Sequence, residues 1–149
     1  MKKRPRYIRA VLFDFDGTLT RPESLDLKVI KRRIGCPENS YLLEYIDTLP
    51  SADERQKALE AVDRFELAAA AKAKPNDGAE ELIGCLRAVG VRVGIVTRNS
   101  HQSVLRALRN FKRIDVADFD IIVSRDEPVD PKPSGDGIHL AARRWLPDL

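Results

Sequence analysis

The most informative stretch of the chain is Val11-Leu12-Phe13-Asp14-Phe15-Asp16-Gly17-Thr18-Leu19-Thr20, in which a continuous apolar run leads to two carboxylates. An unbroken apolar run is typical of a strand covered on both faces, as in a parallel sheet flanked by helices. An ordinary turn would account for Asp16 and Gly17, but it would not account for Asp14 inside the apolar run. Two neighbouring carboxylates repel each other unless a cation lies beside them. The stretch therefore predicts a strand end that holds a cation and a phosphoryl group.

Strands and helices alternate through most of the chain. Further strands are expected at residues 91–96 and 119–123, in addition to the first at 7–13. Short connections and alternating strands and helices predict an α/β fold, with a doubly wound parallel sheet and right-handed crossovers. Because ligands of such sheets bind at the carboxyl ends of the strands, the residues after each strand are the candidates for a functional site.

The helices between the strands are marked by caps and stops. Asp77, with Glu80 three residues later, predicts the start of one helix, and Gly90 predicts its end. Asn99 or Ser100 is expected to cap the next helix. The helix that starts near Asp77 is expected to face the sheet with Leu82, Leu86 and Val89. The last helix is expected to face it with Ile138, Ala141, Ala142 and Trp145.

The segment that follows the first strand has a different character, because it carries helical periodicity and no strand signal. Short helices are expected within residues 25–34 and 41–49. Ser51 and Glu54 form a capping-box pattern, which predicts the start of a longer helix. We therefore expect a small all-helical insertion at residues 21–75.

The polar residues at the strand ends fit phosphoryl-transfer chemistry. Asp14 and Asp16 suit a nucleophilic carboxylate beside an acid/base carboxylate, since carboxylates that form an aspartyl-phosphate are an established class of nucleophile. The backbone at Gly17 and the hydroxyl of Thr97 suit an anion. Lys132 alone would be an ordinary solvated loop lysine, but together with the other residues it supplies a positive charge for a phosphoryl group.

Three segments resemble the motifs of the haloacid dehalogenase superfamily of phosphohydrolases. Residues 13–19 (FDFDGTL) resemble its first motif, residues 95–97 (IVT) its second and residues 131–133 (PKP) its third, in the same order. The resemblance runs from about residue 9 to the end of the chain, and the first motif is the most specific. The helical insertion is similar to the small cap of the phosphoglycolate-phosphatase-like branch.

The resemblance implies a fold in two parts. It implies a three-layer Rossmann-like core at residues 1–20 and 76–149, with an incomplete parallel sheet of about three strands, and a helical cap at residues 21–75. The family's fourth motif, an acidic one that completes the metal site, is absent from this chain. Without the strands that accompany it, Val11–Phe13 becomes an exposed apolar edge. We expect either that the chain is a C-terminally truncated portion of a longer phosphatase or that a partner subunit or swapped segment covers this edge.

The resemblance also implies roles for individual residues. Asp14 would attack phosphorus, and Asp16 would protonate the leaving oxygen and then activate water. Mg²⁺ would lie against Asp14 and Asp16, the latter through its backbone carbonyl. The phosphoryl oxygens would be held by Gly17, Thr97, Arg98 and Lys132. The dehalogenating branch lacks the second aspartate, so Asp16 favours a phosphate substrate over a haloacid.

The implied function is a Mg²⁺-dependent phosphohydrolase that acts on a small phosphorylated metabolite, with a phosphomutase as a close variant. The alternative is a catalytically impaired or non-catalytic phosphate-binding module, because the acidic metal-binding motif is absent. Asp126 and Glu127 are not expected to replace that motif, since two inter-strand steps place them about 9–10 Å from the first strand. No residue pattern in the insertion identifies a substrate.

Composition limits the other classes of function. The net charge is +3, with 43% hydrophobic and 33% charged residues, as in an ordinary globular domain. The basic cluster at residues 2–6 is interpreted as a solvated tail, so no nucleic-acid partner is expected. No signal segment or membrane span is apparent, and the two cysteines, Cys36 and Cys85, form no metal pattern. A cytoplasmic location, without membrane partners, is therefore expected.

Overall fold

The computed structural model describes residues 7–145, so the interpretation of the basic cluster at 2–6 lies outside the described residues. The sheet consists of β1 (Ala10–Phe13), β2 (Arg92–Val96) and β3 (Ile121–Val123). The strands are parallel and lie in the order β1-β2-β3. The α/β class and the parallel sheet are therefore confirmed. The strands begin one to three residues later than the sequence predicts.

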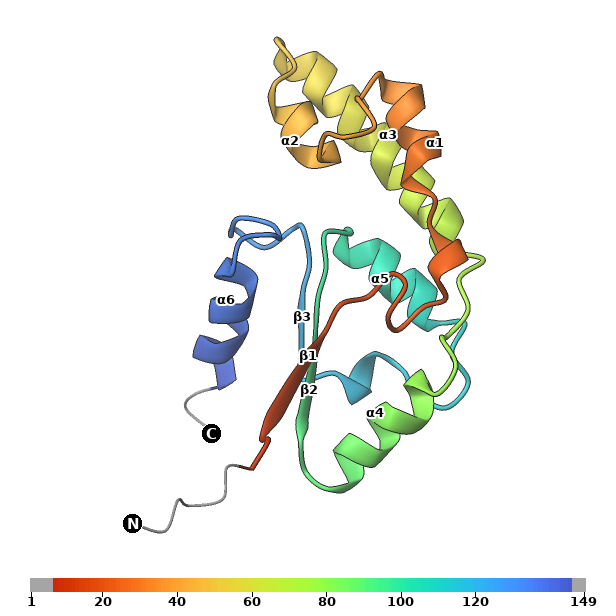
Figure 1. Cartoon of the computed structure of the whole chain (residues 1–149), viewed down its shortest axis with the longest axis vertical. Helices are drawn as coiled ribbons and strands as arrows, with labels where there is room; N and C mark the ends of the chain where they lie inside the picture. The colour runs from red at the N-terminus through yellow and green to blue at the C-terminus, as the bar shows by residue number, and fades with distance from the viewer. Residues whose placement is uncertain (1–6, 146–149) are drawn as a thin grey trace.

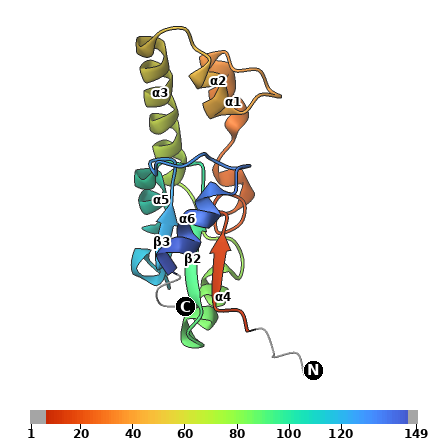
Figure 2. The same cartoon turned by 90° about the vertical axis from the view of Figure 1, so that its left-hand side faces the viewer.

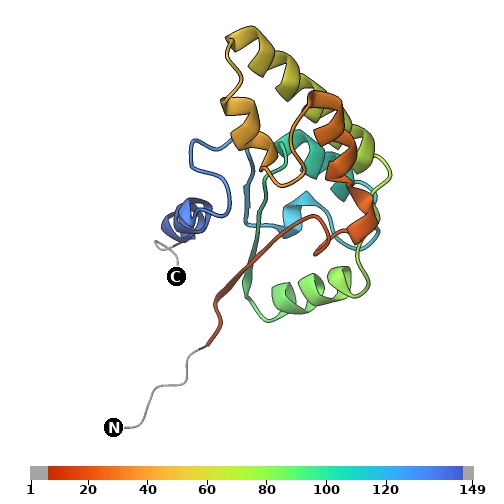
Figure 3. The same cartoon turned by 45° about the horizontal axis from the view of Figure 1, so that its top comes forward.

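The helices are α1 (Leu27–Ile34), α2 (Leu42–Asp47), α3 (Ala52–Ala70), α4 (Ala79–Ala88), α5 (His101–Leu108) and α6 (Asp136–Trp145), with short 3-10 turns at Pro22–Ser24 and Val116–Asp118. Figure 1 shows the sheet edge-on, with α6 on one face and α4 and α5 on the other. Figure 3 shows α4 and α6 on opposite sides of the strands. The arrangement is the expected three-layer one.

Alternate residues of β2 divide the core between the two faces of the sheet. Val93 and Ile95 pack toward α4 and α5, in a cluster that also holds Phe15 and Ile83. Val96 packs toward α6, with Ala141 and Trp145 among its neighbours. Gly94 shares this second face, and a Cβ there would lie 2.6 Å from Ile121 Cγ2 and 3.0 Å from Cη2 of Trp145 on α6. The missing side chain therefore allows α6 to approach the sheet.

Strand β1 forms one edge of the sheet among the described residues, as Figure 2 shows. All four of its residues are half-buried, whereas four of the five residues of β2 are fully buried. The edge position agrees with the expectation drawn from a sheet of about three strands. Within residues 7–145, the apolar run at 11–13 therefore belongs to a strand that pairs with a neighbouring strand on one side only.

Two of the predicted helix faces are wrong in part. In α4 the buried residues are Ala79 and Ile83, while Leu82 and Val89 are exposed. Asp77 does not cap α4, because Gly78 occupies the N-cap position with φ 78°, and Asp77 instead forms an ion pair with Arg21 at 2.8 Å. Tertiary packing therefore buries a different set of α4 residues from the set that the helical periodicity predicts.

In α6 the stripe is displaced in the same way. Gly137, Ala141 and Trp145 are buried, whereas Ile138 is exposed rather than inward-facing. A Cβ at Gly137 would lie 3.0 Å from Val96 Cγ1, so α6 approaches the sheet at this glycine. The contact at Gly137 turns the next residue, Ile138, toward solvent.

Helices α1–α3, called the helical insertion from here on, have an apolar cluster of their own. Its buried members are Ile30, Cys36, Leu42, Ile46, Ala58 and Val62. The capping box is confirmed: Ser51 Oγ accepts from the Glu54 amide at 3.1 Å and Glu54 Oε2 accepts from the Ser51 amide at 3.1 Å. The insertion lies over the carboxyl ends of the strands in Figures 1 and 2. The division of the chain at residues 20 and 75 into two domains stays a prediction.

No helix within residues 7–145 combines the length and the apolar character needed to cross a membrane.

Candidate active site

The loops that follow the strands meet below the helical insertion. They line a cavity of about 290 Å³ together with side chains from the insertion. Five of the six predicted site residues line this cavity: Asp14, Asp16, Thr97, Arg98 and Lys132. The sixth, Gly17, follows Asp16 directly in the turn after β1. Residues separated by more than one hundred positions in the sequence therefore share one cavity, as the parallel sheet requires.

Asp14 lies at the end of β1 and contacts a lysine. Lys132 Nζ is 2.5 Å from Asp14 Oδ1, and the Asp14 side chain is half-exposed. The lysine comes from the loop before α6, where prolines flank it on both sides and restrict the backbone. The carboxylate is thus accessible from the cavity and already paired with one positive charge.

Asp16 is more enclosed than Asp14 and is held by an amide. Burial raises the pKa of Asp16 from 3.8 to about 6. The hydrogen bond from Asn99 Nδ2 to Asp16 Oδ2, at 2.6 Å, opposes this rise. The negative charges of Asp14 and Glu66 add to the rise, and the positive charge of Lys132 opposes it. A carboxyl with this pKa exchanges a proton close to neutral pH, which suits an acid/base group.

The turn after β1 places Gly17 beside the two carboxylates. The carbonyl of Phe15 accepts from three successive amides, those of Thr18, Leu19 and Thr20, at 2.9–3.2 Å. This tight turn requires the left-handed conformation of Gly17, with φ 73°, which glycine adopts without strain. The amide of Thr18 is used inside the turn, so the Gly17 amide is the better candidate for an anion.

Thr97 and Arg98 follow β2. The buried hydroxyl of Thr97 accepts from the amide of Asn99 at 3.2 Å. The guanidinium of Arg98 donates to Glu44 on α2 at 2.5 and 3.0 Å, and it also donates to the carbonyl of Lys132. Arg98 thus connects the insertion with the lysine loop. The role of its side chain or backbone in holding a phosphoryl group stays a prediction.

The aromatic ring of Tyr41 lies next to this arginine. The guanidinium carbon of Arg98 is 5.2 Å from the ring centroid, a distance typical of a cation–π contact. The hydrogen bonds from Arg98 lower the pKa of Glu44 below its usual value. The insertion therefore provides both a carboxylate and a ring for this one guanidinium at the cavity.

The described residues offer few side-chain donors for a metal ion. Within residues 7–145, no three or more His, Cys, Asp or Glu side chains group as a metal site. Asp126 accepts from the amide of His101 at 2.7 Å, and Glu127 pairs with Arg144 at 2.9 Å, so both are engaged elsewhere. Mg²⁺ is commonly held by one or two carboxylates, waters and a substrate phosphate. Asp14 and Asp16 fit that smaller donor set.

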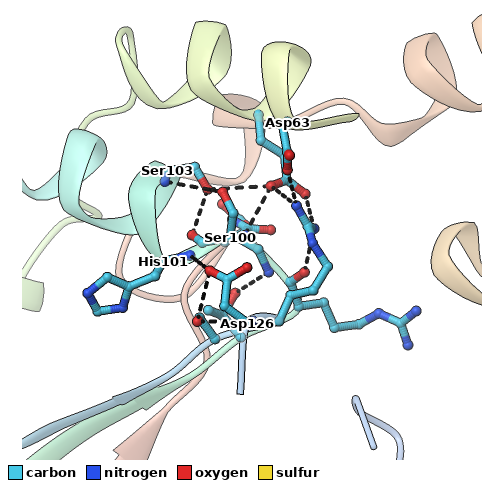
Figure 4. Close-up of polar contacts among 12 residues, drawn as sticks. Asp63, Ser100, His101, Ser103 and Asp126 are labelled. Atoms are coloured by element: carbon cyan, nitrogen blue, oxygen red, sulfur yellow. Dashed lines mark hydrogen bonds and ion pairs between the residues drawn. The ribbon is translucent and has the colours of Figure 1, made fainter. Parts of the chain in front are cut away.

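A polar network that the sequence did not reveal lies behind the site. Glu66 and Asp63 of α3 pair with Arg125, which follows β3, at 2.8 and 2.5 Å. Figure 4 shows this network beside Ser100 and Ser103, with the imidazole of His101 pointing away from it. The sequence offers one signal only, an Asn-Ser pair after β2, which predicts a helix cap at one of the two residues. Ser100 is the cap of α5, and Asn99 contacts Asp16 instead.

Comparison with known proteins agrees with this geometry. The model of the haloacid dehalogenase-like hydrolase family matches residues 8–147. The chain therefore belongs to the haloacid dehalogenase-like hydrolases. An uncharacterised hydrolase of Saccharomyces cerevisiae is 31% identical over 140 residues, which cover 93% of this chain and 64% of the yeast protein. The chain thus spans less than two thirds of the length of this relative.

Solved structures show the same fold. A protein from Lactobacillus plantarum assigned as a phosphoglycolate phosphatase superposes with a TM-score of 0.70 at 18% identity, covering 95% of this chain and 73% of that one. CbbY from Rhodobacter sphaeroides, in complex with phosphate, superposes with a TM-score of 0.67 at 24% identity, covering 94% of this chain and 73% of that one. At these identities the likeness establishes the fold, and the chemistry is argued from the residues of this chain.

Proposed function

We propose that this hydrolase cleaves phosphate monoesters of small metabolites through an aspartyl-phosphate on Asp14. One observation carries the proposal: an accessible carboxylate, Asp14, is paired with Lys132 at 2.5 Å in the same cavity as Asp16, whose pKa is raised to about 6. A nucleophile, an acid/base group and a positive charge for the phosphoryl oxygens are therefore close together.

In the first step, an oxygen of Asp14 attacks phosphorus. A new O–P bond forms as the ester P–O bond breaks, and the leaving oxygen takes the proton of Asp16. In the second step, ionised Asp16 takes a proton from water, and the water oxygen attacks phosphorus. Phosphate then leaves and the Asp14 carboxylate is regenerated. Lys132, the hydroxyl of Thr97 and the amide of Gly17 hold the phosphoryl oxygens.

Asp14 and Asp16 are the residues that would hold Mg²⁺, and the ion would neutralise charge on the phosphoryl oxygens. The support for this part is the donor chemistry, since the two residues offer hard oxygen ligands beside a cavity that admits a small phosphate ester.

A second function, phosphate binding without turnover, has one observation in its favour. Within the described residues, Asp14 and Asp16 are not joined by a third acidic side chain in a metal-binding group. Under this alternative, phosphate would bind at Lys132 and Thr97, and the chain would not cleave an ester.

Hydrolysis of 4-nitrophenyl phosphate in the presence of Mg²⁺ tests the proposal. Replacing Asp14→Asn removes the nucleophile and should lower kcat by at least about 10³-fold. Asp53→Asn is a matched control, because Asp53 is exposed on α3 and pairs with Lys57. Full activity in Asp14→Asn would contradict the mechanism. Binding of inorganic phosphate without hydrolysis across a panel of phosphate esters would favour the second function.

A further inference from the structure

Glu66 is a buried carboxylate that the helical insertion directs into the core. It lies on α3 and is 4% exposed. A buried carboxylate is costly unless it is paired and hydrogen-bonded. Arg125 donates to both of its oxygens, at 2.8 and 3.0 Å, and the amide of Ser100 and the hydroxyl of Ser103 donate at 3.1 and 3.4 Å. All of these partners belong to the segments that follow β2 and β3, so Glu66 is satisfied by the core and not by its own insertion.

Arg125 also holds the loop after β2. Its Nη1 donates to the carbonyl of Arg98, and its backbone amide donates to the carbonyl of Asn99, both at 2.9 Å. The amide of Thr97 donates to Val123 at 2.9 Å. Each residue of the loop at 97–100 is thus tied down by a backbone hydrogen bond to Val123, Arg125 or Glu66. The bonds to the Arg98 carbonyl and from the Ser100 amide are made by the side chains of Arg125 and Glu66, so they depend on the ion pair between those two residues.

This loop presents one side chain to the acid/base carboxyl. Asn99 is buried, and its Nδ2 donates to Asp16 Oδ2 at 2.6 Å. A carboxyl oxygen that accepts from an amide is the poorer position for a proton. The proton of Asp16 therefore lies on the other oxygen, Oδ1, when the group acts as an acid.

We propose that Asn99 is a positioning residue for Asp16 and that the Glu66–Arg125 ion pair holds Asn99 in place. On this basis the helical insertion is part of the acid–base machinery, because it supplies one half of the pair. The inference rests on the phosphatase function proposed above. It gives Asn99, Glu66 and Arg125 a role in positioning the acid/base carboxyl, in addition to any contribution to stability.

Two esters that differ in leaving group provide the test. A general acid matters most for a poor leaving group such as phenol and least for 4-nitrophenol, which leaves as a stable anion. Asn99→Ala should lower kcat/KM for phenyl phosphate by about 10²-fold and for 4-nitrophenyl phosphate by about threefold at most. Glu66→Gln should show the same preference, with a smaller loss. Glu60→Gln is the control, because Glu60 is exposed on the same helix.

The result that overturns the proposal is an equal loss for both esters, since a merely structural role lowers the two rates together. A wild-type protein that cleaves neither ester refutes the phosphatase function instead. The side-chain amide signal of Asn99 in a ¹H–¹⁵N spectrum, assigned by its loss in Asn99→Ala, then still tests the coupling. It should shift in Glu66→Gln and stay in place in Glu60→Gln, and an unchanged position in both variants overturns the proposal. If Glu66→Gln does not fold, the two esters with Asn99→Ala decide.

Discussion

Among residues 7–145, two arginines of the core, Arg98 and Arg125, form ion pairs with the helical insertion, and these two bridges differ in burial. The outer bridge pairs Arg98 with Glu44, whose side chains are 23% and 45% exposed. The inner bridge pairs Arg125 with Glu66, whose side chains are 14% and 4% exposed. Exposed pairs are screened by water and contribute little, whereas breaking a buried pair leaves an uncompensated charge. The same two parts of the chain are therefore joined by one weak contact over the cavity and one that is costly to break.

The difference in burial separates two tasks. The outer bridge lies at the cavity, where a ligand can compete with Glu44 for the guanidinium. The inner bridge lies behind the loop at 97–100, where its side chains bond the Arg98 carbonyl and the Ser100 amide on either side of Asn99. Positioning requires a contact that does not open readily, and burial provides it.

The largest expected effect comes from removing the buried carboxylate. Glu66→Ala leaves Arg125 with Asp63 as its remaining carboxylate partner, and we expect a loss of about 3–5 kcal/mol in the free energy of unfolding. Urea unfolding measures this quantity. Glu60→Ala on the same helix should change it by about 0.5 kcal/mol at most. Equal effects of the two substitutions would contradict the importance of burial.

The next effect is a gain, and it concerns Asp16 beside the inner bridge. Burial raises its folded-state pKa from 3.8 to about 6, so the wild type loses stability as the pH rises through this range. Asp16→Asn removes the ionised form and should gain roughly 2–3 kcal/mol above pH 6. The gain should vanish below about pH 4. Unfolding with a metal chelator present, at pH 4 and pH 7.5, measures both values.

The charge of Glu66 contributes to the raised pKa of Asp16. The gain from Asp16→Asn should therefore shrink in a Glu66→Gln background. An undiminished gain in that background would show that the inner bridge does not act on Asp16 electrostatically.

A smaller loss is expected from filling the space at Gly94. An added Cβ would lie 2.6 Å from Ile121 Cγ2 and 2.8 Å from Leu12 Cδ2, so Gly94→Ala should cost about 1–3 kcal/mol. Gly84→Ala is the matched control, since nothing lies within 4 Å of its Cβ position in α4, and it should be neutral or slightly stabilising.

Gly94→Ala, compared with Glu66→Ala, also tests whether the inner bridge makes the insertion and the core unfold as one cooperative unit. Trp145, the single tryptophan, packs against the sheet, and its fluorescence reports on the core. Circular dichroism reports on all helices, including those of the insertion. The two unfolding curves should coincide in Gly94→Ala and should separate in Glu66→Ala. Coincident curves in both variants would weaken the distinction between the bridges.

The smallest effect is expected at the outer bridge. Glu44→Gln should cost about 1 kcal/mol at most, because the pair is exposed, and 1 M salt should reduce this cost. Hydrogen bonds from Arg98 lower the pKa of Glu44, so the contribution is present above its ordinary pKa of 4.5 and is lost as the pH falls below it. The difference in unfolding free energy between wild type and variant, measured from pH 7 to pH 3, should therefore decline toward zero.

Much of the local structure could be predicted from neighbouring residues. The capping box at Ser51 depends on contacts within about five residues, and the sequence predicts it correctly. The parallel sheet also followed from the pattern, because strands and helices alternate. The faces of α4 and α6 were predicted less well. Periodicity defines several possible apolar stripes, and close packing at Gly137 decides which stripe of α6 meets the sheet.

Local pattern and the rule for parallel sheets are enough to predict the class of fold and the approximate place of each strand and helix. They also predict the grouping of Asp14, Asp16, Thr97 and Lys132 at the strand ends. Which charged side chains form pairs depends on the tertiary packing. Glu66 and Arg125 are 59 residues apart, and Glu44 and Arg98 are 54 apart. No local signal distinguishes such partners from the many other charged residues. Pairing at this distance is settled by the packing that brings the insertion over the sheet, and burial then decides which pair is costly to break.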